Sequence, residues 1–455
     1  MGLSPILFLL TWVAGIGATL FVSAEYGLYS YLIMFHMSPE HTWWGRSVPD
    51  LRYLMIVGLL ALARTATRKD PHPGEPWHRM PIIRTFIIFN VWLWLINLWA
   101  LSPLLHRTGC ILYFKHLIIV YITYSLCKDN LEVIKRALLV IVVGCGWFGW
   151  QAMGKSGRVE GVAGAIADAN TLGMHSATGV IIGSMMILGF RNYYRWVPFA
   201  CMPLVLNLVV LAGSRGGFLG LVSGGLVAMF FCPRSLKRRF KLLGALGVVL
   251  FLMLAHDQFI DRLTGLFDAA EGEEELDGSA SSRLVIAAAG WRMALDRPLG
   301  AGHKGHAILS PYYLDESYLT GGGRVGEEKG RSAHNSFMSA IVEYGFPGVF
   351  MYGLMYILAG FALLRLRRFA AQREDVELGI VVAATAAGLT VVFVAGQFSS
   401  YVYAENQFWL FAICSALVAL TRRQAATEAA AVPDAMAGEV GHHGMIEAGP
   451  TAHPR

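Results

Sequence analysis

Long apolar runs recur along most of this chain, and they restrict the possible folds more than any other feature. Hydrophobic residues make up 55% of the sequence and charged residues only 15%, a balance that excludes an ordinary soluble domain. A helix of about 20 apolar residues crosses the roughly 30 Å hydrocarbon core of a bilayer. We therefore predict an all-α fold, a polytopic transmembrane helical bundle of about 12–13 spans. The expected spans lie near residues 3–22, 24–37, 51–64, 80–101, 109–126, 132–150, 170–190, 194–212, 215–232, 239–256, 335–364, 377–397 and 404–421.

Lysine and arginine gather in every second loop of this arrangement, for example at residues 234–241 and 365–368. Cytoplasmic loops of membrane proteins carry an excess of these residues, so we expect the basic loops to be cytoplasmic. The long loop 257–334 then lies on the far side. The net charge of +6 follows from the same bias, so we expect the lipid bilayer as a partner and no nucleic acid.

The chain divides into three parts: N-terminal transmembrane helices over residues 1–150, a transmembrane core over 151–423 that includes the loop 257–334, and a tail over 424–455. The tail is rich in Ala, Gly, Glu and His and poor in large apolar residues. We expect it to be a disordered cytoplasmic end.

Inside the long loop we expect short helices. The segment 282–296 is amphipathic and should lie across the top of the bundle. Its predicted apolar face consists of Leu284, Ala287, Ala288, Trp291 and Leu295.

A histidine stands where the long loop returns to the membrane, in Ser332-Ala-His334-Asn335-Ser336. An ionisable side chain at such a place is costly unless it is used or well partnered, which makes His334 a candidate functional residue. The alternative is that Ser332 caps the following helix and that His334 is merely part of the cap.

An arginine opens the span near residue 215, in Gly213-Ser214-Arg215-Gly216-Gly217. A guanidinium, free amides and the helix dipole at one place form an anion site, and phosphate would suit it. The alternative is an interfacial arginine that reaches lipid head groups.

Further polar residues fall on the same outer side. Arg283 follows two serines in the long loop, and Arg158 precedes Asp168 and Asn170 at the start of the span near 170. Each has a plainer interpretation, because Arg283 could be a solvated loop charge and Asp168 or Asn170 a helix cap.

No metal site and no cofactor are expected. The six cysteines lie in or beside apolar spans without Cys-x-x-Cys spacing, which suggests neither a disulfide framework nor a zinc site. His303 and His306 lack a convincing third ligand.

Two arginines and a base on one face suit the attack of an acceptor hydroxyl on a sugar that is linked through diphosphate to a lipid. The histidine would take the hydroxyl proton, and the arginines would hold the leaving diphosphate.

Two motifs carry a resemblance to a known family. His334-Asn335, nine residues, Gly345, two residues and Gly348 resemble the histidine motif of bacterial O-antigen ligases. Arg215-Gly-Gly-Phe-Leu219 is similar to their Arg-x-x-x-Leu motif. The resemblance covers roughly residues 150 to 420 and indicates the O-antigen ligase and polymerase superfamily.

Two further features resemble the subgroup of O-glycosylation ligases associated with the exosortase A system. One is the short N-terminal hairpin with its Trp43-Trp44-Gly45 loop, and the other is the Gly-rich lead into Asp168-Ala-Asn170-Thr171.

The resemblance implies a multi-pass glycosyltransferase of the bacterial inner membrane that takes a glycan from undecaprenyl diphosphate on the periplasmic face. His334 carries over as the base and Arg215 as a diphosphate contact, while Arg283 carries over by its place in the loop. We expect the substrate contacts to be Arg158, Asp168, Asn170, Ser214, Asn335, Glu343 and Tyr344.

The acceptor stays open between lipid A core and a hydroxyl on an exported protein. A polymerase that joins lipid-linked repeat units is an alternative with the same donor. A transporter of lipid-linked glycans is an alternative from another class, but it would favour charges facing a cavity at mid-membrane.

Overall fold

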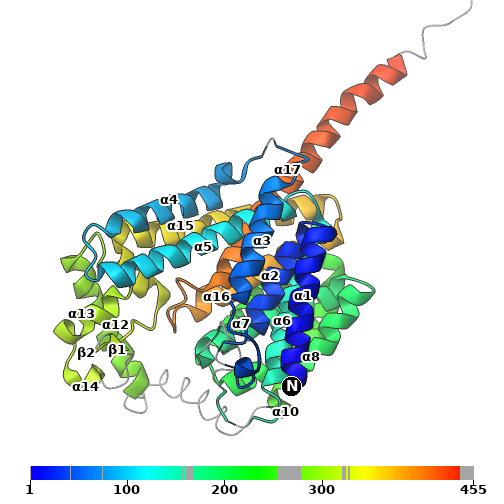
Figure 1. Ribbon diagram of the computed structural model, residues 1–455. Coiled ribbons are helices and arrows are strands. Elements are labelled where there is room, and N and C mark those ends of the chain that lie inside the picture. The colour runs from blue at the N-terminus through cyan, green and yellow to red at the C-terminus, as the bar shows by residue number, and fades with distance from the viewer. Residues whose placement is uncertain are drawn as a thin grey trace, which may run out of the picture.

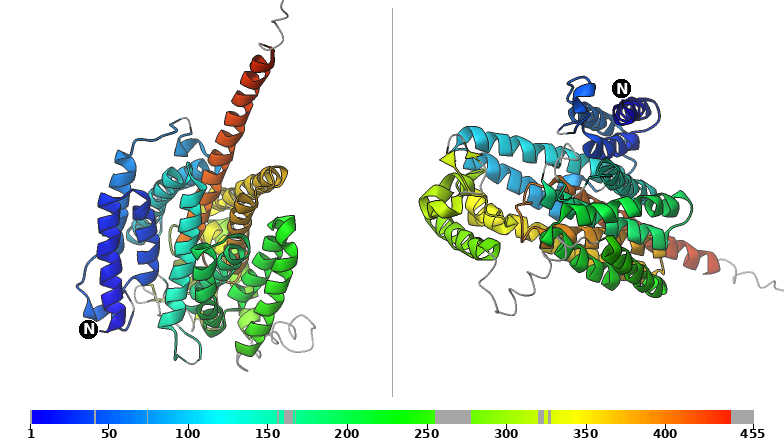
Figure 2. Two further views of the ribbon diagram at one scale, coloured as in Figure 1. Left: turned by 90° about the vertical axis from the view of Figure 1, so that its right-hand side faces the viewer. Right: turned by 90° about the horizontal axis from the view of Figure 1, so that it is seen from below.

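A computed structural model shows that the protein is a bundle of helices (Figures 1 and 2). The structure describes residues 2–40, 42–73, 75–155, 157–159, 166, 168–254, 278–319, 324–325 and 328–440. The bundle helices are α1 (Leu3–Phe21), α2 (Glu25–Met37), α3 (Tyr53–Thr67), α4 (Pro81–Ile96), α5 (Pro103–Cys127), α6 (Leu131–Gln151), α7 (Ala169–Gly189), α8 (Tyr193–Ala212), α9 (Arg215–Phe231), α10 (Lys237–Leu254), α15 (Ser336–Gln372), α16 (Val376–Ala395) and α17 (Glu405–Val440). Short 3-10 helices cover Gly45–Ser47, Trp77–Arg79 and Arg234–Leu236.

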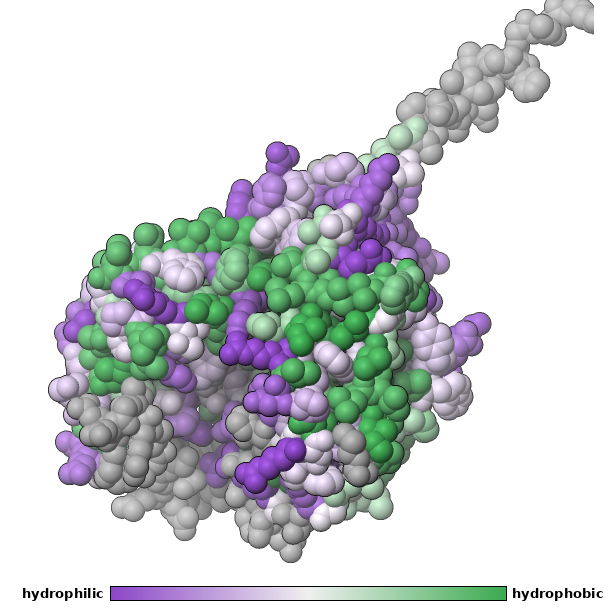
Figure 3. Space-filling model, in the orientation of Figure 1, coloured by the Kyte–Doolittle hydropathy of each residue, from purple (hydrophilic) through white to green (hydrophobic). Residues whose placement is uncertain are grey.

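The predicted all-α polytopic fold is confirmed, and each predicted span coincides with one helix. Among the described residues, six helices are long and apolar enough to cross a bilayer, namely α1, α5, α7, α8, α15 and α16. The helices α3, α4 and α9 are apolar but shorter. The full number of spans therefore remains a prediction. Broad apolar areas cover α1 and α4 on the visible face, and hydrophilic side chains gather where α17 leaves the bundle (Figure 3).

The centre of the bundle is formed by α7 and α16, each of which is 83% buried over its most apolar part. The helix α9 packs against both of them. Gly220 and Gly224 on α9 allow the close approach to α16. A Cβ added to Gly220 would lie 2.9 Å from the carbonyl oxygen of Val391, and a Cβ added to Gly224 would lie 2.6 Å from the Val391 Cγ2 atom. Small residues four apart bring membrane helices together in this way.

The long loop carries α12 (Gly278–Asp296), α13 (Gly305–Tyr313) and α14 (Glu316–Leu319). Two-residue strands, β1 (Arg324–Val325) and β2 (Glu328–Lys329), pair antiparallel. These elements lie at the end of the molecule opposite the projecting end of α17 (Figure 1). We call the two ends the loop end and the tail end.

The predicted apolar face of α12 is not the face that packs. Leu284, Trp291 and Leu295 are exposed, whereas Ile286 and Met293 are fully buried. The packed face is rich in Ala and Gly, which lets α12 approach α15 closely. A Cβ on Gly290, for example, would come within 2.7 Å of the Met338 sulfur.

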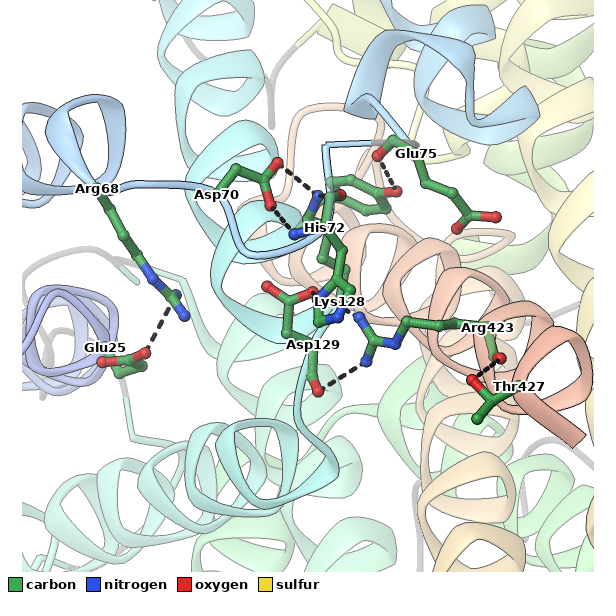
Figure 4. Close-up of polar contacts among 10 residues, drawn as sticks. Glu25, Arg68, Asp70, His72, Glu75, Lys128, Asp129, Arg423 and Thr427 are labelled. Carbon is green, nitrogen blue, oxygen red and sulfur yellow. Dashed lines mark hydrogen bonds and ion pairs between the residues drawn. The ribbon is translucent and has the colours of Figure 1, made fainter. Parts of the chain in front are cut away.

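At the tail end, α17 is held by a polar network (Figure 4). The Asp129 carboxylate accepts from the Arg423 guanidinium at 2.7 Å and lies 3.0 Å from Nδ1 of His72. The Lys128 ammonium donates to Asp70 at 2.7 Å. These contacts tie α17 to the loops before α4 and α6.

The structure places residues 424–440 in α17, where the sequence predicted the start of a disordered tail. Ala, Glu and Gln are strong helix formers, and extending an anchored helix needs no new nucleus. Residues 441–455 lie outside the described part of the chain.

Candidate functional site

A polar pocket of about 220 Å³ lies at the loop end. It is bordered by α7, α9, α12 and the loop between α16 and α17, and three arginines line it. Its lining residues are Arg158, Asn170, Gly213, Ser214, Arg215, Gly216, Arg283, Phe398, Ser399 and Tyr401. The structure thus brings together five residues that the sequence predicted for the site. A second pocket, of about 370 Å³ between α2, α3 and α5, contains none of them.

Arg215 is the first residue of α9, and the local sequence fixes that start. Gly213 adopts the left-handed conformation with φ 56°, which ends α8 and turns the chain. The Ser214 hydroxyl then accepts a hydrogen bond from the Gly217 amide at 3.1 Å and caps α9. The start of α9 places the positive end of the helix dipole beside the Arg215 guanidinium.

Asn170 and Arg158 also line the pocket and are paired, because the Arg158 guanidinium donates to the Asn170 side-chain oxygen at 3.2 Å. Asp168 has a structural partner of its own. It caps α7, because its carboxylate accepts from the Thr171 amide at 2.9 Å and from the Thr171 hydroxyl at 2.5 Å. The capping interpretation of Asp168 therefore holds, while Asn170 lines the pocket.

His334 is half-buried and has a positive φ of 51°, a conformation that is strained for a residue with a Cβ. Burial, and after it the positive charges of Arg331 and Arg283, lower its pKa to about 4, while the Asp168 carboxylate acts in the opposite direction. His334 thus lies within electrostatic range of the pocket. It is neutral at neutral pH, the state in which an imidazole can accept a proton.

The cap of α15 is Asn335, not Ser332. The Asn335 side-chain oxygen accepts from the amides of Phe337 at 2.9 Å and Met338 at 3.0 Å. Its side-chain nitrogen donates to the Gln397 carbonyl at 3.2 Å. Asn335 therefore fixes the backbone that presents His334, and it does not line the pocket.

The loop between α16 and α17 contributes residues that the sequence did not single out. The Ser336 hydroxyl donates to the Ser399 carbonyl at 3.1 Å and accepts from the Tyr401 amide at 2.8 Å. Ser399 and Tyr401 both line the pocket. A signal was present, because residues 397–401 form a polar break between two apolar runs on the predicted outer side.

Glu343 and Tyr344 lie elsewhere, buried below the loop end. The Nδ1 atom of His303 lies 3.3 Å from the Glu343 carboxylate and 3.2 Å from the Tyr344 hydroxyl. Neither residue lines the pocket. Both belong to α15 and come directly before a break in that helix at Gly345, which has φ 72°.

The break in α15 is paired with the segment 298–302. The amides of Ala301 and Gly302 donate to the carbonyls of Val342 and Glu343, both at 2.9 Å. The backbone directly before Gly345, within the span of the histidine motif, therefore holds this part of the loop in place.

Among the described residues, one group of side chains could hold a metal ion. His36, Cys145 and His175 are buried between α2, α6 and α7, with their ligand atoms within 4.8 Å of one another. The two histidine Nε2 atoms are 2.8 Å apart, and Nδ1 of His36 lies 2.6 Å from the Leu32 carbonyl. These hydrogen bonds satisfy the pair without an ion, and none of the three residues lines the pocket.

Comparison with known protein families gives a match for part of the chain. No curated protein sequence matches the chain. Residues 199–353 match the family model described as O-antigen ligase. The matched segment contains Ser214, Arg215, Arg283 and His334, whereas Arg158 and Asn170 lie outside it. With the apolar helices, this match supports a multi-pass inner-membrane glycosyltransferase of the O-antigen ligase superfamily.

Proposed function

We propose that the protein transfers a glycan from undecaprenyl diphosphate to an acceptor hydroxyl, at the periplasmic face of the membrane. The observation that carries this proposal is the meeting of Arg158, Arg215 and Arg283 in one pocket, with His334 outside its lining but within electrostatic range of Arg283. The pocket is smaller than the roughly 300–1,000 Å³ that encloses a drug-sized ligand. Its size and charge suit a diphosphate, with the glycan and the lipid chain outside it.

The chemistry is one displacement. His334 takes the proton of the acceptor hydroxyl while its oxygen attacks the anomeric carbon. The bond between that carbon and the phosphate oxygen breaks, and the electron pair leaves with the diphosphate. The arginines hold the charge that develops there, because guanidinium pairs with phosphate through directed hydrogen bonds.

Donor binding also prepares the base. In the free protein, burial and, after it, the positive charges of Arg331 and Arg283 keep the pKa of His334 low. A bound diphosphate offsets part of that charge, so the pKa of His334 rises and the imidazole becomes a stronger base.

The test uses purified protein in lipid nanodiscs with a lipid-linked glycan donor and candidate acceptors. We expect His334→Ala to abolish transfer and Arg215→Ala to reduce it by at least about a hundredfold. Arg191→Ala is the matched control, since Arg191 is exposed in the loop before α8. Transfer by His334→Ala at the parent rate would disprove the mechanism. We also propose that transfer needs no metal, so it should continue in the presence of a chelator.

The acceptor that is used in the transfer assay distinguishes the remaining alternatives for the function. We expect transfer either to lipid A core or to a Ser or Thr hydroxyl of an exported protein, the latter for the exosortase-associated subgroup. Lengthening of lipid-linked repeats without any acceptor would instead identify a polymerase. Movement of donor across a sealed vesicle without transfer would identify a transporter.

A further inference from the structure

The helix α12 presents an apolar stripe to the outside. Leu284, Trp291 and Leu295 have exposed fractions of 65%, 49% and 56%. Their spacing of seven and four residues places them on one helical face. The opposite face, with Ile286 and Met293, is buried in a small core shared with α15. The stripe is thus a surface left open after α12 has packed.

This stripe continues onto the side of α15 that faces outward. The ring of Trp291 meets the ring of Phe346 edge to face, with centroids 6.1 Å apart. Beyond Phe346, the exposed side chains of α15 include Phe350 and Phe361. Since α15 is a candidate membrane span and only 28% of its most apolar part is buried, these side chains are available for contact with lipid.

We propose that α12 lies in the surface of the bilayer at the loop end, with Leu284, Trp291 and Leu295 inserted among the lipid chains. Tryptophan is favoured at the boundary between lipid and water. Arg292 is exposed next to Trp291 and can meet lipid phosphates. On the same flank, Asp296 accepts a hydrogen bond from the Tyr313 hydroxyl at 2.5 Å, which holds α12 against α13.

Docking of α12 has a consequence for the pocket that rests on the proposed function. Arg283 immediately precedes the stripe on the same helix and lines the pocket. A helix fixed in the lipid surface holds Arg283 at the depth of the lipid phosphates. A diphosphate that arrives on a lipid anchor meets it there.

The test places a polarity-sensitive fluorophore on single cysteines of the full chain in nanodiscs. Cys201→Ala serves as the background, because Cys201 is half-buried and the other five cysteines are buried. Labels at Trp291→Cys and Leu295→Cys report the stripe. Phe361→Cys on α15 is the control for lipid, and Glu316→Cys on the exposed side of α14 is the control for water.

We expect labels at 291 and 295 to be quenched by spin-labelled lipid as at 361, and protected from a water-soluble quencher. Quenching from water as at 316 would overturn the proposal. Protection from both quenchers would also overturn it, since a protein surface would then cover the stripe. None of these outcomes depends on enzymatic activity.

A second measurement tests the consequence. The double variant Trp291→Gln, Leu295→Gln removes two apolar side chains from lipid contact, so we expect kcat/KM for the lipid-linked donor to fall by roughly tenfold. The loss should appear in KM, with an unchanged melting temperature, and Trp291→Leu, Leu295→Met should restore it. Unchanged kinetics together with lipid quenching would overturn the consequence for Arg283 while leaving docking intact.

Discussion

Gly173 of α7 and Gly217 of α9 lie back to back, so that a Cβ on Gly217 would be 2.8 Å from the carbonyl carbon of Gly173. This contact lets the first turns of α7 and α9 meet. Asn170 and Arg215 stand on these turns and line the same pocket. The geometry of the pocket therefore depends on two glycines that do not line it, because a side chain at either position would push α7 and α9 apart.

We expect Gly217→Ala to push α9 away from α7 and to cost about 1–3 kcal/mol, because the new Cβ meets backbone that cannot move aside. Transfer activity should fall with the displacement of Arg215. Gly225→Ala is the matched control on α9, since its Cβ would meet nothing within 4 Å. Thermal melting and transfer assays on both variants check this. Equal behaviour of the two would contradict the role of the contact.

The fold was largely predictable from the sequence, because apolar runs and basic loops are local signals. Each predicted span coincides with a helix, and Arg215 carried a local signal in its flanking glycines. The end of α17 was not predicted, because composition alone does not show that residues 405–423 anchor a helix able to continue through residues 424–440.

The roles of Glu343 and Tyr401 could not be predicted, because both depend on contacts distant in sequence. Glu343 belongs to the break in α15 that pairs with residues 298–302. Tyr401 reaches the pocket through the bond of its amide to Ser336. Neither contact leaves a periodic or compositional signal.

The titration of His334 predicts a pH dependence of stability. Burial and neighbouring positive charges lower its pKa from 6.5 to about 4. As the pH falls, the unfolded chain binds the proton first, so the stabilising effect of neutral His334 is complete above about pH 6.5 and is lost as the pH falls to about 4. The loss is on the order of 3 kcal/mol. We expect His334→Gln to melt at a temperature that depends less on pH over this window.

Variants of Asn335 can show whether this residue acts as a helix cap or as a substrate contact. Asn335→Ala removes the acceptor for two amides of α15 and should cost about 1–2 kcal/mol. Asn335→Asp keeps that acceptor but loses the donor to Gln397, so we expect a smaller loss of stability. Melting temperatures and transfer rates of both variants decide the point. If both lost activity equally at an unchanged melting temperature, Asn335 would be a substrate contact instead.

Gly345 should tolerate no side chain. Its φ of 72° is strained for other residues, and a Cβ would lie 2.4 Å from the carbonyl carbon of Leu299 and 2.5 Å from the carbonyl oxygen of Pro298. We expect Gly345→Ala to cost about 3 kcal/mol or more, because strain and a backbone clash act together. Gly360→Ala on the same helix is the control, since its Cβ meets nothing within 4 Å and alanine favours a helix by about 1 kcal/mol. Melting of the two purified variants measures the difference. A melting temperature of Gly345→Ala equal to that of the parent would show that the break in α15 is not needed to hold residues 298–302, and with them the loop that carries His334.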